Sequence, residues 1–363
     1  MECEDTLTDP LKRSWTVIGL MSGTSLDGLD VALCEFTSIE GEHEWKGEIK
    51  DFSCFDFPDS LKNRLRNSMK LMSEDVYKLD RDWAYFAAQC VNSINKKADL
   101  LSSHGHTVFH NPKEGYTVQI GSGADLAALT ALPVVCDLRR LDVAYGGQGA
   151  PLVPLVDLLL FTEYSACINL GGFSNISHLH GNQTKAWDIG VCNNLLNHLS
   201  REINLDYDDS GNIALSGDII PELFSSLMSL PYHGLPTPKS LGMEWINESV
   251  LPILKKYSDS KLEDRMRTSV EYIARTIVEA CPSSGTVLIT GGGVFNTFLM
   301  TRLQNLSKLL DFNFEVPNPQ MSQGKEAYAF AFLGLLRYLN KPNILRTVTG
   351  ASKASSGGAV WLP

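Results

Sequence analysis

The 363-residue sequence lacks the features that mark several common classes of protein. No uninterrupted apolar run approaches the roughly 20 residues that a membrane-spanning helix needs. Lys and Arg number 31 against 42 Asp and Glu, which gives a formal net charge of −11. The chain therefore lacks the basic excess that nucleic acids and anionic membranes require of a partner. We predict neither a nucleic-acid partner nor a membrane partner.

Paired cysteines are also missing. The eight cysteines are scattered singly, without a C-x-x-C pair, and most of them stand in apolar stretches. This pattern predicts buried thiols in a reducing compartment rather than disulfides or a zinc site. The first residues, MECED, are acidic where a signal peptide would be basic. We predict a cytoplasmic protein in which residues 1–14 form a disordered leader.

Two common phosphate-binding motifs are absent as well: the G-x-x-x-x-G-K-[ST] loop and a G-x-G-x-x-G turn that opens a helix. A different glycine-rich segment, IGLMSGTSLDGLD at residues 18–30, connects two apolar strands. Gly23 and Gly28 permit positive φ at its tip, and Thr24 and Ser25 supply hydroxyl and N–H donors. This hairpin predicts a site for the phosphates of a nucleotide.

Candidate metal ligands are few. Asp27, inside the same turn, can hold a Mg²⁺ ion that neutralises phosphate charge. His104, His106 and His110 form a second cluster, and a metal site is conceivable there because H-x-H on a strand can place two imidazoles on one face. No Cys or carboxylate stands beside them, and the small residues that separate them favour a substrate-facing turn instead.

The plan of the first hairpin returns at residues 166–179, ACINLGGFSNISHL, as apolar strand, polar turn and apolar strand. The spacing of roughly 150 residues suits a duplicated α/β domain better than a solenoid. Two such hairpins facing each other across a cleft could grip one polyphosphate, whereas two ordinary glycine hairpins are the alternative. We predict an N-terminal domain over residues 15–132 plus 341–363 and a C-terminal domain over residues 133–340.

Four further positions could take part in chemistry. Asp188 ends a predicted strand just before a predicted helix, which suits either a helix N-cap or the carboxylate that a kinase needs beside its acceptor. Arg139 lies in CDLRRLD at residues 136–142, where recognition of a sugar carboxylate and a solvated surface cluster are the alternatives. Glycines 291–293 follow a strand, so a base or ribose can lie against flat backbone there. Glu326 is most simply a first-turn acid favoured by the helix dipole.

Taken together, these segments resemble the anhydro-N-acetylmuramic acid kinases, which share a superfamily with sugar kinases, Hsp70 and actin. The matching blocks run in family order along nearly the whole chain: GLMSGTSLDGLD at 19–30, SHGHTVFHNP at 103–112, QIGSG at 119–123, CDLRRLDVAYGGQGAPLVP at 136–154, NLGGFSNI at 169–176, WDIG at 187–190, TGGGVFN at 290–296 and KEAYAFA at 325–331. The sequence departs from the usual family pattern at His106, where Gln is common, and at residues 189–193, where Thr-Gly-Pro-Gly-Asn or a close variant is common.

The resemblance implies a two-domain α/β fold, a duplicated ribonuclease H-like architecture of the actin-like and sugar-kinase type with a central ATP cleft. It also implies that ATP, with Mg²⁺, phosphorylates O6 of 1,6-anhydro-N-acetylmuramic acid while water opens the anhydro bridge at C1. The product is N-acetylmuramate 6-phosphate, an intermediate of peptidoglycan recycling. Asp188 falls on the catalytic base, and Arg139, Glu326, Thr107 and His104 fall at the sugar. The residues that we expect to bind ATP are Gly23, Thr24, Ser25, Leu26, Asp27, Gly28, Leu29, Asp30, Gly171, Gly172, Asn175, Gly291, Gly292, Gly293 and Asn296.

Two alternatives stay open at this point. A related enzyme opens levoglucosan, and the two substrates are distinguished by whether the Arg139 loop faces a lactyl carboxylate. Residues 238–242, PKSLG, resemble the shorter bacterial members and favour the muramate substrate. An ATP-driven binding module like actin or Hsp70 would need a further domain, for which the length leaves little room. The oligomeric state is open, a homodimer included.

Overall fold

The structure is a computed structural model, and it describes residues 13–23, 26–39, 44–308 and 310–363. The chain divides into two compact units: unit 1 is Met1–Leu160 with Gly324–Pro363, and unit 2 is Phe161–Gln323. The expected leader falls outside the described residues as far as residue 12. Ser14, its last residue, already begins the first strand.

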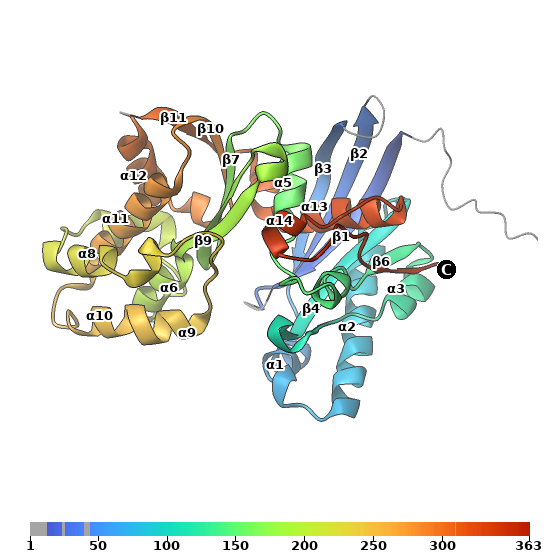
Figure 1. Ribbon diagram of the computed structural model, residues 1–363. Helices are drawn as coiled ribbons and strands as arrows, with labels where there is room; N and C mark the ends of the chain where they lie inside the picture. The colour runs from blue at the N-terminus through green and yellow to red at the C-terminus, as the bar shows by residue number, and fades with distance from the viewer. Residues whose placement is uncertain (1–12, 24–25, 40–43, 309) are drawn as a thin grey trace, which may run out of the picture. The chain divides into compact units, whose positions relative to one another are not determined.

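Unit 1 is built on one seven-stranded sheet (Figure 1). Its strands are β1 (Ser14–Ser22), β2 (Leu29–Ile39), β3 (Glu44–Phe55), β4 (Leu100–Asn111), β5 (Tyr116–Ile120), β6 (Val134–Cys136) and β12 (Ala359–Trp361). The order is β12-β6-β4-β1-β2-β3, with β5 paired to β4. β1, β2 and β3 are antiparallel neighbours, whereas β4 runs parallel to β1 and β6 parallel to β4.

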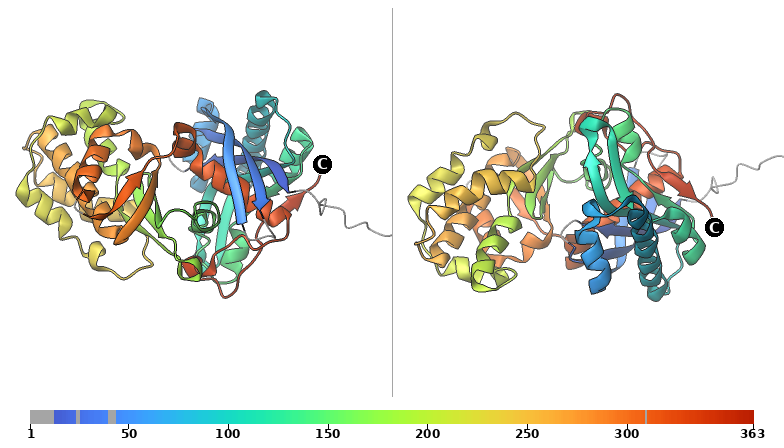
Figure 2. Two further views of the ribbon diagram at one scale, coloured as in Figure 1. Left: turned by 90° about the horizontal axis from the view of Figure 1, so that it is seen from above. Right: turned by 90° about the horizontal axis from the view of Figure 1, so that it is seen from below.

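Helices cover both faces of this sheet (Figures 1 and 2). They are α1 (Asp59–Arg66), α2 (Ser73–Ile94), α3 (Gly123–Thr130), α4 (Arg140–Ala144), α5 (Val153–Leu160), α13 (Pro319–Tyr338) and α14 (Arg346–Thr349), and α13 crosses from unit 2 into unit 1. Trp83 of α2 is buried in a core with Ile18 and Leu20 of β1. Between them, Gly19 faces the opposite way, and its missing side chain lets the backbone of α13 approach at Ala327. The alternation along β1 therefore supplies one face to each helix.

Unit 2 is built on a five-stranded sheet of order β11-β10-β7-β8-β9. Its strands are β7 (Ala166–Leu170), β8 (Phe173–His178), β9 (Lys185–Val191), β10 (Ser284–Thr290) and β11 (Asp311–Glu315). Its helices are α6 (Asn193–Ser200), α7 (Asn212–Leu215), α8 (Pro221–Met228), α9 (Met243–Trp245), α10 (Leu251–Lys255), α11 (Leu262–Ala280) and α12 (Thr297–Ser307). Val270, Ile273 and Ile277 of α11 are fully buried in the core of this unit. Across the described residues, we find no helix that combines the length and the apolarity that crossing a membrane would demand.

The two sheets share one topology. In each unit the first three strands form an antiparallel meander, and two later strands add in parallel on the far side of the first strand. The spatial order is β3-β2-β1-β4-β6 in unit 1 and β9-β8-β7-β10-β11 in unit 2, which is third-second-first-fourth-fifth in both when the additional strands β5 and β12 of unit 1 are left out. This repeated order confirms the predicted duplicated ribonuclease H-like fold of the actin-like and sugar-kinase type.

The units meet at different residues from those expected. The expected boundaries lie at 132/133 and 340/341, whereas the chain passes between the compact units at 160/161 and 323/324. The first difference arises because β6 pairs with β4 and β12, so the chain stays in unit 1 after residue 133. The second arises because α13 is one continuous helix whose residues from Gly324 onward pack in unit 1. Local sequence patterns reveal neither the strand pairing of β6 nor the packing of α13.

Candidate active site

The tip of the first hairpin connects β1 to β2 in unit 1. Thr24 and Ser25, two of its predicted phosphate ligands, lie outside the described residues. Leu26 closes the turn by donating its backbone N–H to Gly23 O at 3.2 Å. Leu26 also adopts a positive φ of 61°, a conformation that a bulky side chain disfavours. The hydrogen bond brings Gly23 and Leu26 together between β1 and β2.

Gly28 and Asp30 lead from this tip into β2. The positive φ expected at Gly28 is wrong, because its backbone is ordinary and its missing side chain instead admits the thiol of Cys54 on β3. The Cys54 thiol also hydrogen-bonds the Asp30 carboxylate. Burial raises the pKa of Asp30, the Cys54 hydrogen bond lowers it, and the nearby charge of Asp27 raises it further. Leu29 is fully buried in the core and takes no direct part in this polar cluster.

Arg139 is held in a fixed position just before α4. Its Nε donates to His104 Nε2 at 3.0 Å, and its Nη1 donates to Gly149 O at 2.6 Å. Its guanidinium carbon lies 5.6 Å from the centre of the Phe330 ring. Burial lowers the pKa of Arg139 to about 10, so the group stays a cation at neutral pH. A guanidinium fixed in this way can present its remaining N–H groups to a carboxylate.

His104 is matched to this arginine as a neutral acceptor. Burial and the charge of Arg139 both hold the pKa of His104 well below its ordinary value. Its ring lies 4.4 Å from the ring of Phe330, measured between centroids. The structure thus joins His104 and Arg139, which the sequence could only suggest separately, into one rigid pair.

Glu326 joins the same neighbourhood from α13. It lies about two turns after the helix begins at Pro319, so the explanation as a first-turn acid is wrong. Loss of solvent raises the pKa of Glu326, the charge of Asp30 adds to the rise, and the charge of Arg139 opposes it. Unit 1 therefore gathers Arg139, His104, Glu326 and Asp30 into one cluster of coupled charges and hydrogen bonds.

Thr107 lies in a strand and not in the turn expected for it. β4 continues past it to Asn111 and pairs with β5, because Gly105 bends the strand with a φ of 73° without ending it. A side chain at Gly105 would collide with Ile120 O of β5. Thr107 Oγ1 accepts a hydrogen bond from Gln119 Nε2 at 3.3 Å. Its role at the sugar stays a prediction.

The second hairpin joins β7 to β8 in unit 2 through Gly171 and Gly172, as predicted. Cys192 N and Asn194 N donate to Gly172 O at 2.9 and 3.1 Å, and Asn193 N donates to Gly171 O at 3.1 Å. The turn therefore occupies the backbone donors at the start of α6. A phosphate at this hairpin would have to use donors of the turn itself.

The glycine triplet packs directly against this second turn. Gly291 has a φ of 90°, and a side chain there would stand 2.5 Å from Asn169 Oδ1 and 2.8 Å from Leu170 N. A side chain at Gly293 would stand 2.6 Å from Leu170 Cβ, whereas Gly292 has no protein atom nearer than 4.0 Å. The two glycine segments of unit 2 thus lie side by side, with Gly292 as the position open to a ligand.

The two predicted ATP-binding asparagines have different surroundings. Asn296 Oδ1 accepts the Leu299 N–H at 2.9 Å and so caps α12. Asn175 lies on β8, where it pairs in register with Asp188 of β9. Asn296 has an evident structural task, and the ATP roles of both residues stay predictions.

Asp188 lies inside β9, and the N-cap of α6 is Cys192, so the helix-cap explanation of Asp188 is wrong. Opposite it, Ser174 pairs with Gly190 and Asn175 pairs with Asp188, which leaves Ile189 as an extra residue in the strand. Such a bulge locally bends a strand and re-aims the side chains beside it. The bulge is a physical reason for the direction of the Asp188 carboxylate that the sequence alone does not disclose.

The carboxylate of Asp188 is buried but not isolated. Its Oδ2 accepts the Leu241 backbone N–H at 2.8 Å. Burial raises the pKa of Asp188, and the Leu241 N–H opposes that rise because it favours the ionised form. A carboxylate whose pKa is raised above its ordinary value binds a proton more readily than an exposed one, which suits a general base.

Sequence reasoning missed the residues that surround Asp188. Tyr232, Lys239 and Leu241 each contact its backbone or carboxylate, although they follow it by more than forty residues. The only signal in the sequence was the resemblance of residues 238–242 to the family. That resemblance assigned no role to any single residue among them.

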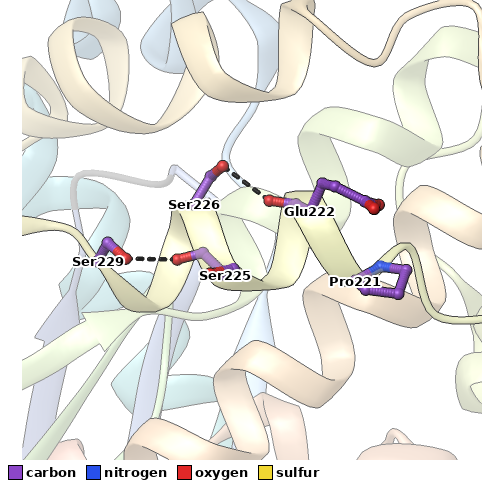
Figure 3. Close-up of a pocket in the computed structure, with 5 residues that line it drawn as sticks. All are labelled: Pro221, Glu222, Ser225, Ser226 and Ser229. Carbon is purple, nitrogen blue, oxygen red and sulfur yellow. Dashed lines mark hydrogen bonds between the residues drawn. The ribbon is translucent and has the colours of Figure 1, made fainter.

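Two hollows among the described residues bear on the site. A cavity of about 280 Å³ in unit 1 is lined by His104 and Gly105 together with Asp80, Asp137 and Trp361. The other lies over α8 of unit 2 (Figure 3), and its lining residues are Pro221, Glu222, Ser225, Ser226 and Ser229. Ser226 and Ser229 donate to carbonyls of their own helix, both at 2.7 Å. The hollow over α8 contains none of the predicted site residues, and the hydroxyls of Ser226 and Ser229 are already engaged.

Comparison with known proteins decides the family. The sequence model of the family described as anhydro-N-acetylmuramic acid kinase matches residues 15–363. The chain belongs to the anhydro-N-acetylmuramic acid kinase family. A relative of that name from Hydrogenovibrio crunogenus is 36% identical over 95% of this chain and 98% of its own length. Another from Haemophilus influenzae is 34% identical over 95% of this chain and 97% of its own length.

Solved structures give a weaker likeness. An activator of 2-hydroxyisocaproyl-CoA dehydratase from Clostridium difficile with bound ADPNP aligns with a TM-score of 0.41 and 12% identity, covering 89% of this chain and 96% of its own. A ROK hexokinase from Thermus thermophilus aligns with a TM-score of 0.33 and 12% identity, covering 88% and 99%. At these scores the likeness supports no argument about the site. Membership of the anhydro-N-acetylmuramic acid kinase family rests on the sequence relationship.

The two candidate metal sites, the histidine cluster and Asp27, have different outcomes. Within the described residues, no group of three or more His, Cys, Asp or Glu side chains could hold a metal ion. The metal site considered for His104, His106 and His110 is therefore wrong for the described chain. Asp27 stands exposed beside Asp30, and one or two carboxylates together with phosphate oxygens and water are the usual ligands of Mg²⁺. These carboxylates fit the predicted Mg²⁺.

Proposed function

We propose that this chain phosphorylates O6 of 1,6-anhydro-N-acetylmuramic acid with ATP while water opens the 1,6-anhydro bridge, giving N-acetylmuramate 6-phosphate. The observation that carries the proposal is the family match over residues 15–363. The geometry agrees with it in two places: a carboxylate oriented to take a proton at Asp188, and a fixed guanidinium suited to a substrate carboxylate at Arg139. The levoglucosan alternative lacks such a carboxylate and is not favoured by the family.

Asp188 acts as the general base in this proposal. Its carboxylate takes a proton from the attacking water, the water oxygen bonds to C1, and the C1–O6 bond breaks. The released O6 then forms the new bond to the γ-phosphorus of ATP as ADP leaves. Positioning and electrostatic stabilisation supply most of the rate in phosphoryl transfer, so fixed groups such as Arg139 matter as much as the base.

Arg139, Glu326, Thr107 and His104 bind the sugar in this proposal. Arg139 recognises the lactyl carboxylate, and His104 keeps the guanidinium in place because it accepts from Nε. Since the pKa of Glu326 is raised, its carboxyl group can share a proton with a sugar hydroxyl more readily than an ordinary carboxylate can.

The nucleotide is bound by the turn at residues 23–30 and, in unit 2, by Gly171, Gly172, Asn175, residues 291–293 and Asn296. Asp27 would hold Mg²⁺, which neutralises phosphate charge during transfer. A chelator should then abolish ADP release, and added Mg²⁺ should restore it. The cytoplasmic location stays a prediction.

One assay tests the proposed function. ADP release is measured with purified protein and 1,6-anhydro-N-acetylmuramic acid, levoglucosan, N-acetylmuramic acid and glucose in parallel. We expect release with the anhydromuramate and at most a small fraction of it with the others. In water enriched in oxygen-18, the label should appear at C1 of the phosphorylated product, which mass spectrometry detects. Release of ADP without any acceptor, or equal rates on levoglucosan, would contradict the proposal.

A further inference from the structure

We propose that Lys239 is a positioning residue for Asp188, and that it works by fixing residues 231–241 against β9. This inference rests on the proposed role of Asp188 as the base. Residues 231–241, called the 231–241 segment below, begin with the 3₁₀ turn Pro231–Gly234. They end at Leu241, whose N–H contacts the carboxylate.

The 231–241 segment makes three hydrogen bonds to a single residue, Asp188. The Tyr232 hydroxyl donates to Asp188 O at 2.6 Å. Asp188 N donates to Lys239 O at 3.0 Å, and Leu241 N donates to Asp188 Oδ2 at 2.8 Å. One residue of β9 is therefore fixed through its N–H, its carbonyl and its side chain by a stretch of chain far away in sequence.

Lys239 ties the two ends of the 231–241 segment together. Its ammonium donates to Tyr232 O at 2.9 Å and to His233 O at 3.1 Å. The same ammonium lies 4.5 Å from the centre of the Tyr232 ring, within reach of a cation–π interaction. Residues 234–238 between these ends are all exposed, and Leu235 N donates to Tyr232 O at 3.1 Å.

The arrangement has a chemical consequence at the carboxylate. Because Leu241 N–H occupies Oδ2, the other oxygen, Oδ1, is the one left to receive a proton. No hydrogen bond from the described part of the chain reaches Oδ1. The N–H also favours the ionised form of Asp188, so a displaced Leu241 would leave a base that is harder to ionise. Lys239 thus controls both the direction and the protonation of the carboxylate while touching neither of its oxygens.

Few other titratable groups face Asp188. The 231–241 segment contributes Tyr232, His233 and Lys239, and α11 contributes Tyr272, whose hydroxyl lies 3.0 Å from His233 Nε2. Burial raises the pKa values of both tyrosines, so neither ionises near neutral pH. Burial and the charge of Lys239 lower the pKa of His233, which keeps the imidazole neutral there. Because Lys239 also lowers the pKa of His233, a shift in the acid limb is assigned to Asp188 only where it persists in a His233→Gln background.

The experiment compares Lys239→Met and Lys239→Arg with the unmodified protein. Met keeps the length of the side chain and removes the ammonium, whereas Arg keeps a cation that can donate to both carbonyls and stack on Tyr232. Lys255→Met, at an exposed position on α10, is the matched control for loss of one lysine charge. The measurements are kcat and KM for ATP and for 1,6-anhydro-N-acetylmuramic acid, the pH profile of kcat/KM, and the thermal unfolding midpoint.

We expect Lys239→Met to lower kcat roughly tenfold and to move the acid limb upward by about half to one pH unit, with KM for ATP unchanged. Lys239→Arg and Lys255→Met should keep the limb of the unmodified protein. An unmoved limb in Lys239→Met would overturn the inference. An equal displacement in Lys239→Arg would also overturn it, because it would trace the effect to local packing.

Failure of the proposed function gives a different result. In that case the unmodified protein releases no ADP with the anhydromuramate, or Asp188→Asn retains activity. A different outcome rejects only the role of Lys239: the unmodified protein releases ADP with the anhydromuramate, Asp188→Asn loses activity, and Lys239→Met behaves like the unmodified protein.

Discussion

Ser22 Oγ lies 2.9 Å from His106 Nδ1, and this hydrogen bond joins the end of β1 to β4 beside the first glycine turn. Both residues are almost fully buried. Burial lowers the pKa of His106 to about 4, so the imidazole is neutral near pH 7. A neutral amide could make the same bond, which agrees with the Gln that is common at this position in the family.

The burial of His106 predicts a loss of stability in acid. In the unfolded chain the His106 imidazole is protonated near its ordinary pKa of 6.5, whereas in the folded protein it is protonated only near pH 4. The free energy of unfolding therefore falls as the pH falls through this window, by up to about 3 kcal/mol for this one group. His106→Gln should lose less stability between about pH 7 and pH 4.5 than the unmodified protein does. Urea unfolding at both pH values measures the difference, and equal losses in the two proteins would show that His106 is not held neutral.

Gly291→Ala should damage the protein through backbone geometry. A Cβ in the left-handed conformation at φ 90° is strained, and here it would also stand 2.5 Å from Asn169 Oδ1. We expect a loss of about 2 kcal/mol or more in stability and a weaker affinity for ATP. The matched control is Gly292→Ala, where no atom lies nearer than 4.0 Å and stability should change little. Thermal unfolding and ATP titration calorimetry measure both effects, and equal destabilisation by the two substitutions would count against this reasoning.

Asp188→Asn should fold normally and bind ATP, yet lose turnover by a hundredfold or more, the usual scale for a positioned base. The amide cannot take the proton of the attacking water. Asp259→Asn, at an exposed position in the same unit, is the control and should keep full activity. Product formation is followed by ADP release and by mass spectrometry of the sugar phosphate. Retained activity in Asp188→Asn would remove this residue from its role.

The pH profile of the unmodified protein gives a further prediction for Asp188. Burial raises its pKa above the ordinary value of 3.8 for Asp, and the base must be ionised to work. Activity should therefore fall as the pH falls through the raised pKa, at a higher pH than an exposed Asp would give. The profile of kcat/KM against pH measures this limb, with stability checked at each pH. A fall that merely follows unfolding, with no earlier limb, would contradict the assignment.

The features that depend on neighbouring residues in the sequence were predictable. The two glycine hairpins and the strand before glycines 291–293 follow from apolar spacing and turn residues, and the structure contains each of them. The duplication was visible because both hairpins use the same plan. The ATP and sugar roles came from the family resemblance rather than from these patterns.

Features that depend on distant contacts were not predictable. No element was predicted over residues 153–160, yet they form α5, whose Asp157 is buried and lies 2.9 Å from Lys325 of α13. Nothing near Asp157 in sequence announces that partner. The bulge at Ile189 and the bond from Leu241 to Asp188 are likewise invisible, because a strand's register and a contact between distant segments leave no local pattern.

Arg139→Lys tests the recognition of a substrate carboxylate. The guanidinium is fixed by two bonds at once, from Nε to His104 Nε2 and from Nη1 to Gly149 O, and a lysine ammonium cannot keep both and still offer a planar pair of donors. We expect KM for 1,6-anhydro-N-acetylmuramic acid to rise by roughly tenfold to a hundredfold, as for a lost charge-assisted bidentate contact. KM for ATP should stay the same. The decisive comparison uses a 1,6-anhydro sugar without the lactyl group, whose residual turnover should be equal in the two proteins. If its turnover falls as much as that of the anhydromuramate, Arg139 supports the local fold and does not read the carboxylate.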